Sequence, residues 1–202
     1  SSQKNFVDEI EDQTRSGFGP DLLITDSDTA LELYKRKLVD PIVIPLEDRA
    51  DTPSYLFDLV TANDGQLVGR PVNQFVQLAC FNKERLPSPP QTLEQMEQDS
   101  EENNFGMALQ LKDLFWSAES FDAGEAMEAA LAKLPPDAER QANVTDWLQW
   151  LENASYQQNI RFLNDQRTLR DALVAGELDW ITCWSSSLRE LREQMKDKLA
   201  LA

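Results

Sequence analysis

The ten residues at 72–81 read VNQFVQLACF and carry the clearest strand signal in the chain. The stretch is rich in apolar residues, and successive side chains of a β-strand point to opposite faces of the sheet. Val76, Leu78 and Cys80 would share one face of the strand, and Phe75 lies on the opposite face. The stretch therefore predicts a strand, and helical patterns lie on both sides of it.

The chain after this strand alternates between helix and strand signals. Residues 92–95 (TLEQ) and 187–190 (SLRE) each form a capping box, a pattern that is typical of the first turn of a helix. Short apolar runs predict further strands at 107–111, 178–184 and 198–202. We therefore expect helices and strands to follow one another through most of this part of the chain.

Two helical stretches lie between these strands. Trp147 and Trp150 begin an apolar stripe with helical spacing that continues to Leu163, so both tryptophans are predicted to be core residues. A short helix is predicted over 167–174, and Gly176 ends it. These assignments rest on the period of the apolar residues alone.

The chain before residue 72 has a weaker pattern. Residues 4–15 predict a short amphipathic helix, which ends at the Gly-Phe-Gly-Pro run at 17–20. The run DLLI at 21–24 has the length of a buried strand, and it leads into helix-capping residues at 25–28. We therefore expect a strand, a tight turn and a helix over 21–38.

The composition excludes several classes of function. The chain has 202 residues, a formal net charge of −17 and no histidine. Nucleic acids and anionic membrane surfaces attract basic proteins, so neither is an expected partner. A Ser-His-Asp triad cannot form within the chain, zinc loses its usual ligand, and no cofactor is expected. The acidic balance also argues against anionic ligands such as phosphate. No apolar run approaches the roughly 20 residues that span a bilayer.

The chain contains two cysteines, Cys80 and Cys183. Two cysteines do not make a metal site, and the sequence is compatible both with a disulfide and with two buried thiols.

Five short motifs follow one another along the chain in the order typical of the solute-binding proteins of bacterial ABC importers, and the chain resembles these proteins. The resemblance is closest to the sugar-binding branch that includes maltose-binding protein. The most specific is residues 81–86 (FNKERL) followed by 89–95 (PPQTLEQ). The others are residues 19–23 (GPDLL), 38–42 (LVDPI), 65–72 (GQLVGRPV) and 173–181 (LVAGELDWI). Several motifs in register are more specific than any one of them.

The resemblance implies an α/β, type II periplasmic-binding-protein-like fold with two lobes, each a sheet flanked by helices, that close on a ligand held between them. Residues 1–70 would be a partial, incomplete first lobe, and residues 71–202 would be most of the second lobe. Family members are typically much longer, so we expect the chain to be a fragment of a longer precursor.

The resemblance also implies a function without covalent chemistry. The protein would not be an enzyme. It would be a monomer that binds a sugar or polyol in the interlobe cleft and delivers it to ABC permease subunits. Its location would be periplasmic or otherwise extracytoplasmic, with a lipid anchor on the full-length precursor as one option. The alternative is a non-transport interaction or sensory module, or a non-binding fragment, that retains this fold.

The first group of expected ligand-binding residues lies at the start of the chain and on the strand at 72–81. Sugar-binding relatives place polar contacts at the positions of Ser27 and Asp28, although capping of the next helix would also explain both residues. Phe75 would stack on a sugar ring and Gln77 would hydrogen-bond to it, with Asn73 beside them. An ordinary amphipathic strand is the competing interpretation of these three residues.

The second group follows two later strands. Residues 112–116 combine polar and aromatic side chains, and such a cluster can bind both the face of a sugar and its hydroxyl groups. The alternative is the start of a helix with two aromatic core residues. The stacking tryptophan of the family aligns with Ser186, two positions after Trp184, so either Trp184 stacks on the ligand or this platform is lost. The expected binding residues here are Lys112, Asp113, Phe115, Trp116, Trp184, Ser185 and Ser186.

Overall fold

The computed structural model describes residues 2–131, 134–135 and 137–202. The chain divides into two compact units, Ser1–Gln74 (unit 1) and Phe75–Ala202 (unit 2), each with its own internal contacts. Among the described residues, no helix combines the length and the apolar character needed to cross a membrane.

Unit 1 is helical. Its elements over residues 2–74 are α1 (Ser2–Arg15), α2 (Ser27–Lys35), α3 (Leu46–Arg49) and α4 (Ser54–Asp58). The predicted amphipathic helix is thus confirmed as α1, and its Val7 and Ile10 pack with Leu33 of α2 in a small core. Asp26 caps α2, because its side chain accepts a hydrogen bond from Thr29 N at 2.8 Å.

The strand predicted at 21–24 is wrong. Residues 21–26 belong to no sheet, and the side chains of Leu22 and Ile24 are 81% and 83% exposed. An extended segment becomes a strand only when a neighbour takes up its backbone hydrogen bonds. Within residues 2–74 the structure shows a single isolated bridge, between Thr61 and Leu67. The expectation of a sheet in the first lobe is therefore not met by unit 1.

Unit 2 contains the sheet. Among the described residues its strands are β1 (Gln77–Asn82), β2 (Phe105–Ala108), β3 (Ile160–Leu163), β4 (Trp180–Trp184) and β5 (Leu199–Leu201). Its α-helices are α5 (Leu93–Asp99), α6 (Leu111–Leu114), α7 (Ala123–Leu131), α8 (Ala138–Tyr156), α9 (Gln166–Ala175) and α10 (Leu188–Met195). Unit 2 also contains the 3-10 helices η1 (Phe115–Phe121), η2 (Ser185–Ser187) and η3 (Lys196–Lys198).

The sheet is mixed, with the strand order β3-β2-β4-β1-β5. β2 runs parallel to both β3 and β4, whereas β1 runs antiparallel to both β4 and β5. The carboxyl ends of β2, β3 and β4 therefore lie side by side at one end of the strands, together with the amino end of β1.

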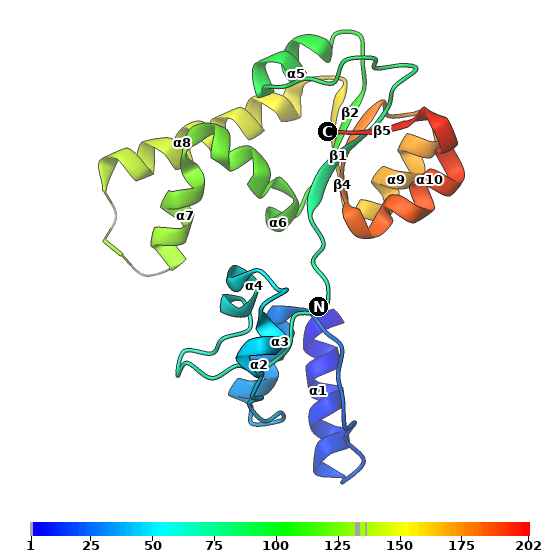
Figure 1. The fold of residues 1–202 in the computed structure, drawn as a ribbon. Coiled ribbons are helices and arrows are strands. Elements are labelled where there is room, and N and C mark those ends of the chain that lie inside the picture. The colour runs from blue at the N-terminus through cyan, green and yellow to red at the C-terminus, as the bar shows by residue number, and fades with distance from the viewer. Residues whose placement is uncertain (1, 132–133, 136) are drawn as a thin grey trace. The chain divides into compact units, whose positions relative to one another are not determined.

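Helices cover both faces of this sheet (Figure 1). One face carries Phe81, Phe105 and Trp180 and packs against a cluster that includes Trp147 and Trp150, which confirms both tryptophans as core residues. The other face packs against α9 and α10 through a second cluster of buried residues, which includes Cys80, Ala108, Leu169, Leu173, Ile181, Cys183 and Leu191.

Close packing explains the glycine at 106. A β-carbon at this position would lie 2.4 Å from Leu178 Cδ1 and 2.7 Å from Leu169 Cδ2. Such distances are far inside van der Waals contact, so a larger residue at 106 would displace the buried side chains of Leu178 and Leu169.

Other boundaries also differ from the sequence prediction. The strand predicted at 107–111 is β2 at Phe105–Ala108, and Leu111 begins helix α6. Ile160–Leu163 is strand β3, not the end of the helical stripe that begins at Trp147. The strand predicted over 72–81 is paired only from Gln77, because residues 72–76 lie outside the sheet ladder. The choice that the sequence left open at the cysteines is resolved as a disulfide between β1 and β4, with a Cα–Cα distance of 5.9 Å.

Candidate functional site

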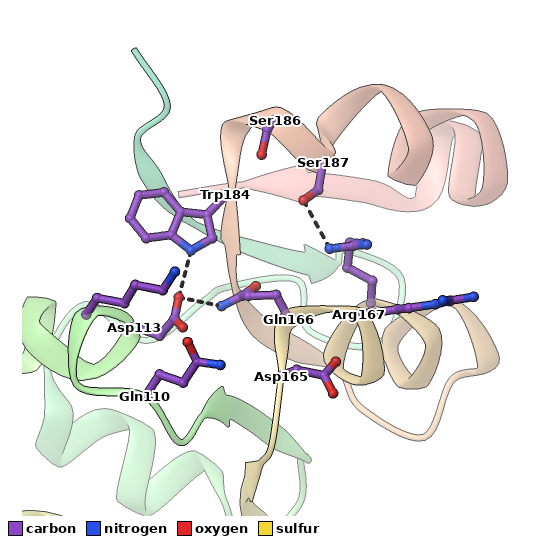
Figure 2. A pocket seen from close by; sticks show the side chains of 10 residues that line it. Gln110, Asp113, Asp165, Gln166, Arg167, Trp184, Ser186 and Ser187 are labelled. Carbon is purple, nitrogen blue, oxygen red and sulfur yellow. Dashed lines mark hydrogen bonds between the residues drawn. The ribbon is translucent and has the colours of Figure 1, made fainter. Parts of the chain in front are cut away.

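A surface pocket of about 500 Å³ lies beyond the carboxyl ends of β2, β3 and β4 (Figure 2). In open α/β sheets ligands bind beyond the carboxyl ends of the strands, because the connecting loops leave a crevice there. The pocket is built from the segments that follow β2, β3 and β4. Its lining residues are Gln110, Lys112, Asp113, Asp165, Gln166, Arg167, Arg170, Trp184, Ser186 and Ser187.

Asp113 organises one side of this pocket. Its side chain is 1% exposed, and its Oδ1 accepts hydrogen bonds from Trp184 Nε1 at 2.7 Å and from Gln166 Nε2 at 3.0 Å. These two contacts join the segments that follow β2, β3 and β4 at a single oxygen, as Figure 2 shows. The indole of Trp184 is thereby held in one orientation at the pocket wall.

Two acceptor atoms of this group remain without partners. Asp113 Oδ2 and Gln166 Oε1 are buried, and neither has a hydrogen-bond partner among the described residues. An unsatisfied buried acceptor costs about 1–3 kcal/mol, so a ligand that donates hydrogen bonds here recovers that energy. Each buried acceptor without a partner calls for an explanation, and at the pocket a donor from a ligand or from water supplies one.

The beginning of β1 is tied to the same site. Gln77 Nε2 donates a hydrogen bond to the backbone oxygen of Asp113 at 2.8 Å. Ser185 binds the residue before β1 twice, since its backbone N–H donates to Val76 O at 2.8 Å and its Oγ accepts from Val76 N at 3.0 Å. Gln77 and Ser185 thus hold the pocket together, and neither lines it.

Asp165 begins the third segment of the pocket. It caps α9, because its Oδ1 accepts hydrogen bonds from Thr168 N at 2.8 Å and from Thr168 Oγ1 at 3.1 Å. Both hydrogen bonds lower the pKa of Asp165, and the bond from the backbone N–H of Thr168 has the larger effect. This carboxylate is therefore ionised at neutral pH and committed to the helix.

The structure brings together part of the predicted binding set. Lys112, Asp113, Trp184 and Ser186 line the pocket.

Other predicted residues lie elsewhere. Trp116 packs against the core, with its ring 6.0 Å from the ring of Trp180, and Phe115 is half-buried in η1 and does not line the pocket. Phe75 is 55% exposed at the start of unit 2. Ser27, Asp28 and Asn73 belong to unit 1, where Ser27 opens α2 and Asp28 stands in its first turn.

Six of the ten lining residues were not predicted from the sequence. Gln110, Asp165, Gln166, Arg167, Arg170 and Ser187 were not among the expected binding residues. Four of them surround the start of α9, and the signal for that position was present in the sequence. The Asn-Asp pair at 164–165, three residues before Thr168, is typical of a helix cap directly after a strand.

The chemistry of the lining is that of noncovalent capture. In the part of the chain that the structure describes, no group of three or more Cys, Asp or Glu side chains converges to hold a metal ion. The pocket instead offers carboxylate and amide acceptors, serine hydroxyls, cationic donors and an indole. Such a set can bind a small polyhydroxylated molecule by hydrogen bonds and by contact with the ring.

The chain is similar to a known family of proteins over nearly its whole length. The family model described as bacterial extracellular solute-binding protein matches residues 2–202, which is nearly the whole sequence. No curated protein matches the chain.

Proposed function

The chain belongs to the bacterial extracellular solute-binding proteins, a non-enzymatic family that serves ABC importers, and we propose that its ligand is a sugar or polyol bound at the pocket of unit 2. In this proposal residues 71–202 act as one lobe and residues 1–70 as part of the other. The ligand would be captured outside the cytoplasm and delivered to permease subunits by a monomeric binding protein.

The unpartnered acceptor at Asp113 is the observation that supports a polyhydroxylated ligand. Its Oδ1 is fully used by Trp184 and Gln166, whereas its Oδ2 has no partner among the described residues. A hydroxyl group can donate to Oδ2, and a neighbouring hydroxyl can donate to Gln166 Oε1. Trp184 lines the same pocket and supplies an apolar ring surface for the carbon face of a sugar.

The remaining predicted residues keep their roles as proposals. Ser27 and Asp28 would contact the ligand from the first lobe of a closed cleft, and Asn73 and Phe75 would contact it from the strand that enters the second lobe. Such closure would bury the ligand between two lobes, as in other hinged binding proteins.

We expect Asp113→Asn to weaken sugar or polyol binding about tenfold to hundredfold. The substitution keeps the shape of the side chain but can replace the acceptor at Oδ2 with an amide donor, and hydrogen bonds to charged groups contribute about 1.5–3 kcal/mol. Thermal shifts across a panel of sugars and polyols would identify a binder, and calorimetry would then give its affinity for the two proteins.

Asp146→Asn is the matched control, because Asp146 is exposed on α8 and does not line the pocket. It should leave both the thermal shift and the affinity unchanged. Equal affinities of Asp113→Asn and the unsubstituted chain would contradict the proposed site. Silence across the whole panel would contradict the proposed ligand class and favour the interaction or sensory module.

A further inference from the structure

The charge of the pocket wall differs from that of the chain as a whole. The chain has a formal net charge of −17, yet Lys112, Arg167 and Arg170 all line the pocket. Two carboxylates lie with them, Asp113 and Asp165, and each already accepts two hydrogen bonds from protein groups. The acidic composition therefore does not describe the surface that a ligand would meet.

The two arginines are weakly engaged by the protein. Arg167 Nε lies 4.0 Å from Asp171 Oδ2, and Arg170 Nε lies 3.6 Å from Glu190 Oε2. Both separations exceed the length of a normal N–H···O hydrogen bond. Arg170 donates from one terminal nitrogen to Ser187 Oγ at 3.4 Å, and its buried Nε has no hydrogen-bond partner among the described residues.

These donors stand where an anion is favoured. Both arginines lie in the first half of α9, and both line the pocket. A planar guanidinium binds the two oxygens of a carboxylate or phosphate in parallel, which an ammonium group cannot do. Lys112 adds a third positive charge from the segment after β2.

We infer that the solute carries an anionic group, a carboxylate or a phosphate ester, bound by Arg167 and Arg170 while its hydroxyl groups reach Asp113 and Gln166. This inference rests on the proposed function, since it names the chemistry of the ligand at the same pocket. The ligand class is thus an acidic sugar or an acidic polyol rather than a neutral one. It reverses the expectation that the acidic composition gave.

The test compares matched neutral and acidic ligands by calorimetry on the full chain. Glucose is paired with glucuronate and with glucose 6-phosphate, and sorbitol is paired with gluconate. We expect the acidic member of at least one pair to bind about tenfold to hundredfold more tightly, as charge-assisted hydrogen bonds would give. Glucuronate and gluconate report a carboxylate, whereas glucose 6-phosphate reports a phosphate ester.

The variants Arg167→Gln and Arg170→Gln make the test specific. Each should lower the ratio of acidic to neutral affinity by about tenfold or more, and a ratio cancels any general loss of pocket shape. Arg192→Gln, which changes an exposed arginine of α10 outside the pocket, should leave the ratio unchanged. Raising the salt concentration should also reduce the acidic preference.

The outcomes separate the two proposals. If neutral members bind as tightly as acidic ones, or if neither arginine variant changes the ratio, the anionic preference is wrong while the sugar or polyol site stands. If no member of any pair binds, both proposals are overturned.

Discussion

Replacement of both Cys80 and Cys183 by alanine should lower the free energy of unfolding of unit 2 by about 4–5 kcal/mol. The disulfide joins residues separated by 103 positions, so it removes a large loop-closure entropy from the unfolded chain. Both cysteines are fully buried between the sheet and the α9–α10 layer, which adds a packing loss when the sulfur atoms are removed.

Urea unfolding followed by tryptophan fluorescence measures this effect directly. All five tryptophans of the chain lie between residues 116 and 184, so the signal reports unit 2 alone. Reduction of the unsubstituted protein with dithiothreitol is the control, because it opens the bond but keeps both sulfur atoms. A loss below about 1 kcal/mol in both experiments would contradict a stabilising role for the bond.

Trp147→Ala should destabilise unit 2 by about 3–5 kcal/mol. The Trp147 side chain is 2% exposed in the larger core cluster, and its Nε1 donates a hydrogen bond to the buried Ser117 Oγ at 2.8 Å. Its removal leaves a large cavity between α8 and η1 and deprives Ser117 of a partner. Urea unfolding and the thermal midpoint would both record the loss.

Two companion variants divide the effect into its parts. Trp147→Phe keeps an aromatic ring and loses the indole donor, so it should cost about 1–2 kcal/mol. Leu148→Ala changes the neighbouring residue of α8, whose side chain is 53% exposed, and should cost under about 0.5 kcal/mol. Equal effects of Trp147→Ala and Leu148→Ala would contradict the core position of the indole.

Local signals predicted much of unit 2 because the tertiary structure agrees with them. Thr92 caps α5 through a hydrogen bond from Gln95 N, as the capping box predicts, and Gly176 ends α9 with a positive φ of 75°. At Ser187 the helix begins as predicted, but the side chain makes no capping hydrogen bond and accepts one from Arg170 instead. Such caps depend on a few neighbouring residues, so sequence reasoning captures their positions well.

The errors concern short apolar runs, whose structure depends on partners distant in sequence. The run at 21–24 finds no ladder within residues 2–74, whereas the run at 160–163 pairs with β2 and becomes a strand at the edge of the sheet. Periodicity over four residues cannot separate these cases from a helix. Because β3 was assigned to a helix, the start of α9 and its arginines were not recognised as neighbours of Asp113.

The binding residues show the same limit. Asp113 and Trp116 are three positions apart, and the sequence offered both as ligand contacts. In the fold Asp113 turns to Trp184 at the pocket, whereas Trp116 packs on Trp180 within the core. Which of the side chains at 113 and 116 faces the pocket depends on the packing of η1 against the sheet, and no local pattern encodes that packing.

The strand order carries a consequence for biosynthesis. β1 pairs with β4 and β5 alone, and its Phe81 lies opposite Trp180, about a hundred residues further along the chain. At ribosomal rates of about 5–20 residues per second, this apolar segment waits roughly 5–20 seconds before either neighbour is made. Throughout that interval the nascent chain exposes an unpaired apolar segment, which is open to aggregation and is a target for a holding chaperone.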